Sequence, residues 1–114
     1  MEVDVAATLI KYLDEATALT WYHNVPQNAP DEFGTLTRDG GTTEIVRDIP
    51  TVTLMVYAST RGRAASLASS VKRSLIAAKW EVDNVFDVTI ESDYYDPLDG
   101  MHRHRITATL IVND

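Results

Sequence analysis

The chain has 114 residues, a formal net charge of −7 and no cysteine. A chain of this length can hold one compact domain with a real core, and the missing cysteines exclude disulfides, thiolate catalysis and cysteine-ligated metals. The excess of acidic residues disfavours a protein that grips DNA, because such binding depends on clustered Lys and Arg. No apolar run approaches the roughly 20 residues that cross a bilayer, so we expect no membrane partner.

The first half of the sequence predicts a helix followed by strands. Residues 3–17 repeat apolar side chains at helical spacing, as in an amphipathic helix. Residues 20–25 predict a short aromatic strand, and residues 33–38 a second strand that ends in the turn Asp39-Gly40-Gly41. Residues 42–50 are ambiguous, since they suit either the extension of a hairpin or a loop.

The second half predicts a strand, a long helix and two further strands. Apolar residues mostly alternate over residues 51–58, with Val52, Leu54, Val56 and Ala58 on one face, and a helical stripe runs from Ala64 to Ala78. Residues 82–92 predict the fourth strand with Phe86, Val88 and Ile90 inward; a loop at 93–100 leads to the last strand, 102–112.

The predicted order is therefore α-β-β-β-α-β-β, in which two amphipathic helices pack on one face of a mainly antiparallel sheet. This is an α+β fold that forms a single domain over residues 1–114. Five apolar residues are assigned to the helix–sheet interface: Leu54, Val56, Leu67, Val71 and Leu110.

The second face of the predicted sheet is polar but not fully hydrophilic. It carries Tyr57 on the third strand, Asp87 and Glu91 on the fourth, and Arg103 and Arg105 on the last. A solvated antiparallel sheet has this character. A wet interface with copies of the same chain has it too, because Tyr and isolated charges suit such a surface. We expect subunits or other proteins to meet where the two arginines face the two acids.

The segment Ser59-Thr60-Arg61-Gly62-Arg63 lies between a strand and a helix, where many proteins hold a phosphate. A phosphate loop needs several glycines and a following Gly-Lys-Ser/Thr, whereas here Gly62 stands alone. The hydroxyl of Thr60 instead suits an N-cap, and the arginines slightly oppose the helix dipole. We therefore expect this turn to start a helix and to bind no nucleotide.

His102 and His104 lie two residues apart on a predicted strand and would point to the same side. The carboxylates of Asp93, Asp96 and Asp99 are near in sequence and could complete a metal site. No third histidine stands at a recognisable spacing, and arginines alternate with the pair, so we expect no metal and no cofactor.

Nothing in the sequence favours an enzyme. No pair of carboxylates stands out, and there is no Gly-x-Ser-x-Gly or Ser-His-Asp arrangement. Tyr94 and Tyr95 lie in the predicted loop, where they either anchor it or dock a partner, since Tyr is favoured at binding hot spots.

Several framework patterns along the chain together form a known arrangement. They are Pro30-x-x-Phe33-x-Thr35-Leu36-x-Arg38-x-Gly40-Gly41, Asp48-x-Pro50-x-Val52-x-Leu54-x-Val56-x-Ala58-x-Thr60-Arg61, the small-residue helix Ala64-Ala65-x-Leu67-Ala68-x-x-Val71 and a Tyr-Asp-Pro turn before the last strand. This arrangement resembles the tail terminator (tail completion, or head–tail joining) proteins of long-tailed bacteriophages, particularly those of actinobacterial hosts. Gly34 departs from it, because a β-branched residue is usual there, which leaves the length of the second strand open.

The resemblance implies a structural virion protein, found in the tail or neck of the particle and in the host cytoplasm during assembly. Such proteins form a ring, usually of six copies, that caps the tail tube, ends its polymerisation and joins it to the head connector. Their partners are further copies, the major tail tube protein and the connector or stopper protein. DNA only passes through the lumen, where acidic walls would repel its phosphates. The alternatives are a related neck protein of the head-completion or stopper kind and, from another class, a small α+β ligand-binding module.

Overall fold

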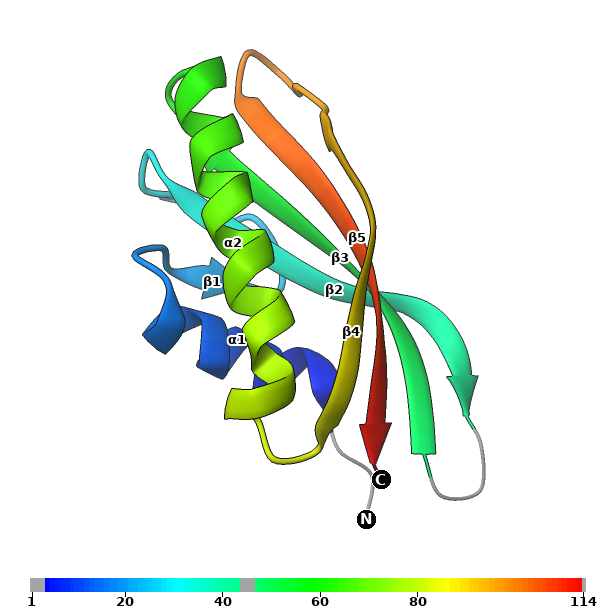
Figure 1. Ribbon diagram of the computed structural model, residues 1–114. Coiled ribbons are helices and arrows are strands. Elements are labelled where there is room, and N and C mark those ends of the chain that lie inside the picture. Colours follow the sequence, from blue (N-terminus) through cyan, green and yellow to red (C-terminus); the bar gives the residue numbers. More distant parts are fainter. Residues whose placement is uncertain (1–3, 44–46, 114) are drawn as a thin grey trace.

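The computed structural model describes residues 4–43 and 47–113, and its elements follow the predicted order (Figure 1). The two helices are α1 (Val5–Ala16) and α2 (Arg61–Glu81). The five strands are β1 (Trp21–Tyr22), β2 (Phe33–Thr43), β3 (Arg47–Ala58), β4 (Val85–Tyr95) and β5 (His102–Asn113). The prediction of an α+β fold with a mainly antiparallel sheet is therefore confirmed.

The strands form one sheet in the order β1-β2-β3-β5-β4. Only β1 and β2 are parallel; the pairs β2–β3, β3–β5 and β4–β5 are antiparallel. Helix α2 connects β3 to β4, and β5 then returns between these two strands. In Figure 1, α2 runs obliquely across one face of the sheet, and α1 lies beside the lower half of α2, below β1 in this view.

Both helices bury their apolar stripes on the same face of the sheet, which we call the inner face. Val5, Leu9 and Leu13 of α1 join the stripe of α2 in one cluster with the inward side chains of the strands. The five residues assigned to this interface are all buried: Leu54, Val56, Leu67, Val71 and Leu110. Their placement from the sequence is confirmed, and the opposite side of the sheet is the outer face.

Side-chain caps set the starts of both helices. The carboxylate of Asp4 accepts a hydrogen bond of 3.1 Å from the backbone N–H of Ala7, and α1 begins one residue later. The hydroxyl of Thr60 accepts a bond of the same length from the N–H of Arg63, which confirms its predicted role as N-cap. The predicted helix start at residue 3 lies outside the described residues.

The prediction of a tight turn at Asp39-Gly40-Gly41 was wrong. Strand β2 continues through a bulge at Asp39 to Thr43, because β3 begins at Arg47 and supplies partners as far as the pair Thr43–Asp48. The ambiguous segment thus extends the hairpin, although its residues 44–46 lie outside the description. The first strand is shorter than predicted, since only Trp21 and Tyr22 pair.

Strand β4 runs from Val85 to Tyr95, so the predicted boundaries were about three residues early. A bulge between Val85 and Asp87 shifts the alternation. As a result Val85 and Val88 face inward, whereas Phe86 is 61% exposed, against its predicted inward position. A second bulge lies between Ile90 and Ser92.

Candidate functional site

The outer face of the sheet carries most of the residues predicted to meet a partner. The register pairs Tyr57 with Arg103 and Met55 with Arg105 across β3 and β5, and Arg105 with Tyr94 across β5 and β4. Side chains of paired residues point to the same side of a sheet. Both helices pack on the other side (Figure 1), so this polar group lies on a face that neither of the two described helices covers.

Arg103 is the centre of a hydrogen-bond network on this face. Its Nε donates to the backbone carbonyl of Asp96 at 2.8 Å, and its Nη2 to the Asp96 carboxylate at 3.0 Å. Its Nη1 donates to the hydroxyl of Tyr57 at 3.3 Å. Partial burial alone lowers the pKa of Arg103, but the bonds to Tyr57 and Asp96 outweigh it and raise the pKa above its usual value. Arg103 therefore holds the β4–β5 turn to the sheet.

Arg105 is held much less firmly than Arg103. Its Nη1 lies 3.9 Å from the Asp96 carboxylate, and 39% of its side chain is exposed, compared with 11% for Arg103. A guanidinium that is partly exposed and loosely paired can be transferred to a carboxylate of another molecule at little cost. Arg105 is accordingly the better candidate of the two for contact with a partner.

The predicted meeting of the arginines with Asp87 and Glu91 does not occur. Asp87 pairs with Ile111, near the opposite end of β5, and Glu91 lies in the second bulge of β4. The acid that reaches both arginines is Asp96, which follows β4 in the turn. Sequence spacing could not reveal this, because the bulges of β4 shift its register against β5.

Tyr57 is on the predicted face but is buried, so its ring is not available to a partner. The ring of Tyr57 stacks on the ring of Phe33 with ring centres 4.3 Å apart. The ring of Tyr22 meets that of Phe33 edge-on, with ring centres 6.1 Å apart. These rings form an aromatic cluster on the outer face, apart from the main core. The alternation of strand β2 signals it, because Phe33 and Leu36 have opposite parity and cannot share a face.

Tyr94 and Tyr95 belong to β4 and not to the predicted loop. Tyr94 is half exposed on the outer face. Tyr95 points to the inner face, where its hydroxyl lies 2.7 Å from Nδ1 of His102 and the guanidinium of Arg61 lies 4.2 Å above its ring. The assignment of Tyr95 to the same interface as Tyr94 is thus corrected, because adjacent strand residues face opposite sides.

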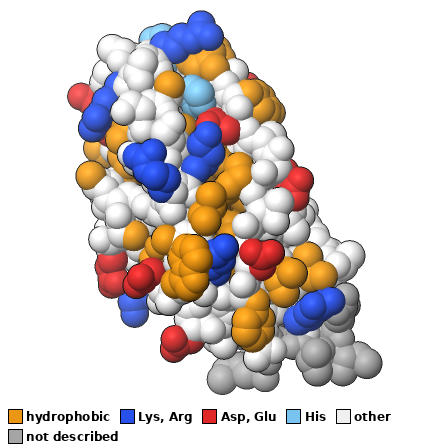
Figure 2. Space-filling model, viewed as in Figure 1, with side chains coloured by type: hydrophobic (Ala, Val, Ile, Leu, Met, Phe, Trp, Pro, Cys, Tyr) orange, Lys and Arg blue, Asp and Glu red, His pale blue; other side chains and the backbone are white. Residues whose placement is uncertain are grey.

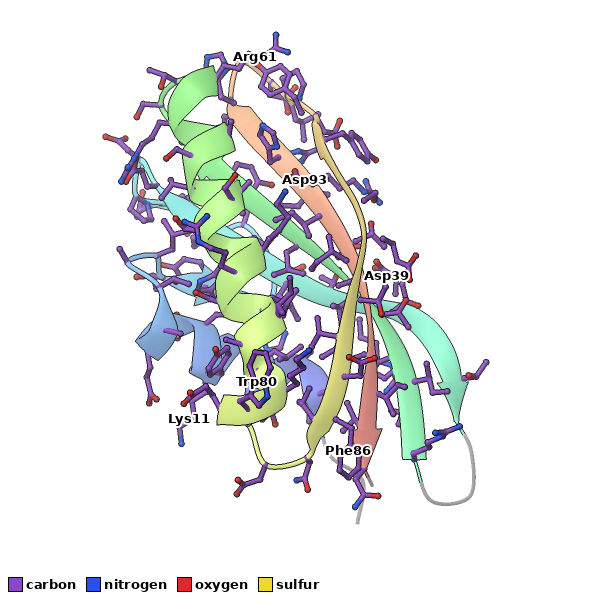
Figure 3. The ribbon with its side chains drawn as sticks, in the orientation of Figure 1. Lys11, Asp39, Arg61, Trp80, Phe86 and Asp93 are labelled. Atoms are coloured by element: carbon purple, nitrogen blue, oxygen red, sulfur yellow. The ribbon has the colours of Figure 1, made fainter. Side chains whose placement is uncertain are left out.

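A polar cluster fills the inner face between α2 and the upper part of β4 and β5, near the label of Asp93 in Figure 3. One Asp93 carboxylate oxygen lies 2.8 Å from Nδ1 of His104 and the other 2.7 Å from Nζ of Lys72. Burial by itself raises the pKa of Asp93, but the bonds from Lys72 and His104 outweigh it and hold that pKa below its usual value.

His102 and His104 face the same side, as predicted. The carboxylates of Asp93 and Asp96, the candidates to complete a metal site with them, lie on opposite faces of the sheet. Of the two histidines Asp93 contacts only His104, and it also binds Lys72, whereas Asp96 is bound by Arg103 on the other face of the sheet. Within residues 4–43 and 47–113, no group of three His, Cys, Asp or Glu side chains could hold a metal ion.

The two arginines in the first turn of α2 contact protein groups. Arg63 forms two hydrogen bonds with the carboxylate of Glu32, at 2.5 and 3.1 Å, and Arg61 lies over Tyr95. The start of α2 is therefore joined to the loop before β2 and to the end of β4.

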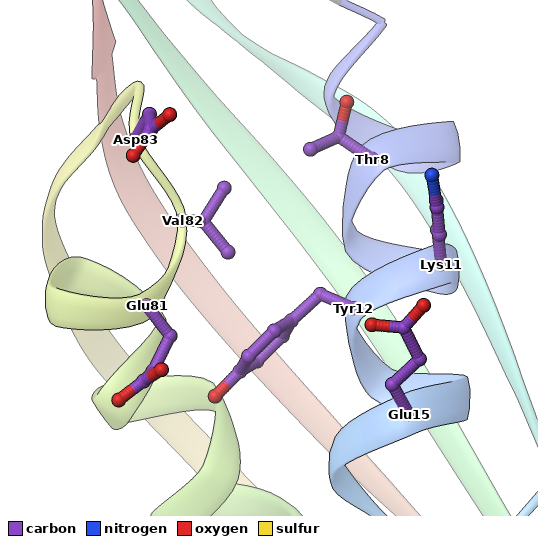
Figure 4. A pocket seen from close by; sticks show the side chains of 7 residues that line it. All are labelled: Thr8, Lys11, Tyr12, Glu15, Glu81, Val82 and Asp83. Carbon is purple, nitrogen blue, oxygen red and sulfur yellow. The ribbon is translucent and has the colours of Figure 1, made fainter.

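A further hollow of about 250 Å³ lies between α1 and the end of α2 (Figure 4). The ring of Tyr12 crosses it and donates a hydrogen bond of 2.7 Å from its hydroxyl to the carbonyl of Ser74. Burial raises the pKa of Tyr12, and the charge of Glu81 raises it further. Three carboxylates and one ammonium group line the hollow, which leaves it with a negative balance of charge: Glu15, Glu81, Asp83 and Lys11. No local sequence pattern signals this hollow, because its two sides are about 70 residues apart in the chain.

Comparison of the chain with models of known protein families gives no match, and comparison with curated proteins gives none that is significant. None of the helices in the described part of the chain is long and apolar enough to cross a membrane.

Proposed function

We propose that this chain is a structural virion protein that forms a ring on the head-proximal end of a phage tail tube. In this role it ends tube polymerisation and joins the tail to the head connector, and it catalyses no reaction. Support comes from the framework residues that resemble tail terminators and from the α-β-β-β-α-β-β order of the elements. The ring, its partners and its place in the virion are proposed together.

The observation that carries the proposal is the outer face of the sheet. Four strands of 11 or 12 residues present it, and both described helices lie on the inner face. Arg105 and Tyr94 lie side by side on it with exposed side chains. Tyr and Arg are the residue types that dominate protein interfaces, so this face suits docking to other subunits.

The assembly problem explains why such a protein is needed. A tube grown by stacking identical rings has no intrinsic end, because each added ring exposes the surface that recruited it. A different ring, with one face that fits the tube and one that fits the connector, stops this growth. A small domain with a wide polar sheet face can supply both contacts.

The test is deletion of the gene from the phage that carries it, followed by electron microscopy of the lysate. We expect DNA-filled heads without tails, together with free tubes of abnormal and often excessive length. Expression of the intact chain from a plasmid should restore joined particles. Normal tails of correct length on intact heads would refute the proposal, whereas correct-length tails lying free of defective heads would indicate the neck-protein alternative.

A further inference from the structure

Exposed large apolar side chains gather along one side of the molecule. Six of the seven that the described residues contain lie on α2, on β4 or in the turn after β4: Ile76, Trp80, Phe86, Tyr94, Leu98 and Met101. Figure 2 shows hydrophobic side chains over the lower half of α2 and the neighbouring β4, and Figure 3 places Trp80 and Phe86 there. We call this strip the β4 side.

Local structure holds the two most exposed of these side chains in solvent. Trp80 is 73% exposed because it lies off the buried stripe of α2, one turn after Ile76, and Lys79 lies 4.4 Å from its ring centre. Phe86 is exposed because the first bulge of β4 turns it outward. Bulges that re-aim a side chain in this way are found next to functional sites.

The same side of the molecule ends in an open strand. Strand β4 is the last in the sheet order, so one of its edges has no strand beside it among the described residues. The other end of the sheet is also open, since β1 pairs only with Gly34 and Thr35, and no other strand of the described residues lies beside that edge of β2. The described part of the chain thus has a strand edge without a neighbouring strand at each end of its sheet.

The two free edges run in opposite directions. Three successive antiparallel pairings, β2–β3, β3–β5 and β5–β4, separate them, so β2 and β4 are antiparallel to each other. When a second copy is rotated about an axis roughly along the strands, its β2 edge meets the β4 edge of the first in the antiparallel sense. A contact between unlike surfaces of this kind builds closed rings when its rotation closes.

We infer that the β4 side is a self-association surface whose occupant is the free β2 edge of a second copy. The inference names the subunit contact of the ring and in that respect rests on the proposed function. Aromatic side chains bury about 150–250 Å² each, so Trp80 and Phe86 together would supply a large part of the roughly 800 Å² per partner of a stable interface. The two bulges limit strand pairing at the β4 edge. The regular segment from Ser92 to Tyr95 would pair with the second copy and supply the rest of the interface.

The first test measures self-association by sedimentation velocity over a wide range of protein concentrations. Trp80→Ser should raise the dissociation constant at least about tenfold, as expected for a central aromatic anchor. The control, Ser66→Ala, changes an exposed residue of the same helix outside the β4 side and should leave the constant unchanged. Circular dichroism should show an intact fold for both variants, because neither side chain is buried.

The second test uses the absence of natural cysteines. A Thr89→Cys variant (β4) and a Thr37→Cys variant (β2) are mixed and treated with a short bis-maleimide. We expect a mixed cross-linked pair, and much less product when Ser66→Cys replaces either variant. Self-association without this cross-link would overturn the edge contact and leave the proposed ring intact. A chain that stays monomeric at every concentration would also overturn the inference, whereas the proposed function is judged separately by the deletion phenotype.

Discussion

The indole ring of Trp21 occupies the space over Gly34 where any other residue would carry its Cβ atom. A Cβ atom at Gly34 would lie 2.5 Å from Cε3 of Trp21. The ring cannot withdraw easily, because its Nε1 donates to the hydroxyl of Thr17 at 3.0 Å and its backbone N–H to the carboxylate of Asp14 at 2.7 Å. Gly34 thus permits the contact that joins the end of α1 to the sheet.

Gly34→Ala should therefore lower the free energy of unfolding by about 1–3 kcal/mol, the usual cost of overpacking. The matched control is Gly62→Ala in the first turn of α2, where nothing lies within 4 Å of the new methyl group. That change should be neutral or stabilising by up to about 1 kcal/mol, since Ala favours helix. Urea denaturation of both variants measures the difference, and an equal effect would contradict the packing.

Leu110→Ala should be strongly destabilising, by about 2–5 kcal/mol, because its side chain is fully buried between the sheet and the helices. Its neighbour Thr109 points to the outer face and is partly exposed, so Thr109→Ala should cost well under that amount. Thermal unfolding of the two variants compares the faces directly. If Thr109→Ala were as harmful as Leu110→Ala, the assignment of inner and outer faces would be wrong.

Acid should weaken the fold through Asp93. Its folded-state pKa is lowered by Lys72 and His104, against an ordinary value of 3.8. The stability that this lowered pKa contributes is complete above about pH 4 and is lost as the pH falls through the folded-state pKa.

Asp93→Asn should consequently flatten the fall in stability below about pH 4, as measured by urea denaturation at a series of pH values. The control is Asp87→Asn, since Asp87 is exposed and no ion pair holds it among the described residues. An unchanged acid dependence in the Asp93 variant would show that its pairing with Lys72 and His104 does not contribute.

Arg103→Gln should destabilise the fold by about 1–3 kcal/mol, because it leaves Tyr57 and Asp96 with partly buried, unsatisfied groups. Arg105→Gln is the matched change one residue along the same face. Its loose pairing with Asp96 should make that cost less than about 1 kcal/mol. Similar losses in both variants would contradict the different roles given to the two arginines.

Arg105→Glu should leave the monomer folded but impair assembly. The new glutamate would repel the partner's carboxylates that the arginine attracts. Infectivity and electron microscopy of particles that carry the variant provide the measurement, with Arg105→Lys as the charge-preserving control. Fully assembled, infectious particles with Arg105→Glu would move the proposed docking site to another surface, such as the β2–β3 hairpin or the turn after β4.

The sequence by itself determined the order of the elements, the buried faces of α1, α2, β3 and β5, and the cap of α2. These features depend on neighbours within a few residues: alternation gives Leu54 and Val56 their face, helical spacing gives Leu67 and Val71 theirs, and the hydroxyl of Thr60 reaches a backbone N–H three residues ahead. Features that depend on residues close together in the sequence can be predicted from the sequence alone.

Only the tertiary structure decided the features that depend on strand register and on contacts with residues distant in the sequence. The bulges of β4 turn Phe86 outward, and the pairing of β2 with β3 carries the strand past Gly40 and Gly41. Thr53 shows the limit most clearly: alternation places it correctly on the outer face, yet it is buried there and its hydroxyl donates to Asp39. A single extra residue in one strand reverses the facing of all that follow, and no local pattern reveals which partner strand will accept it.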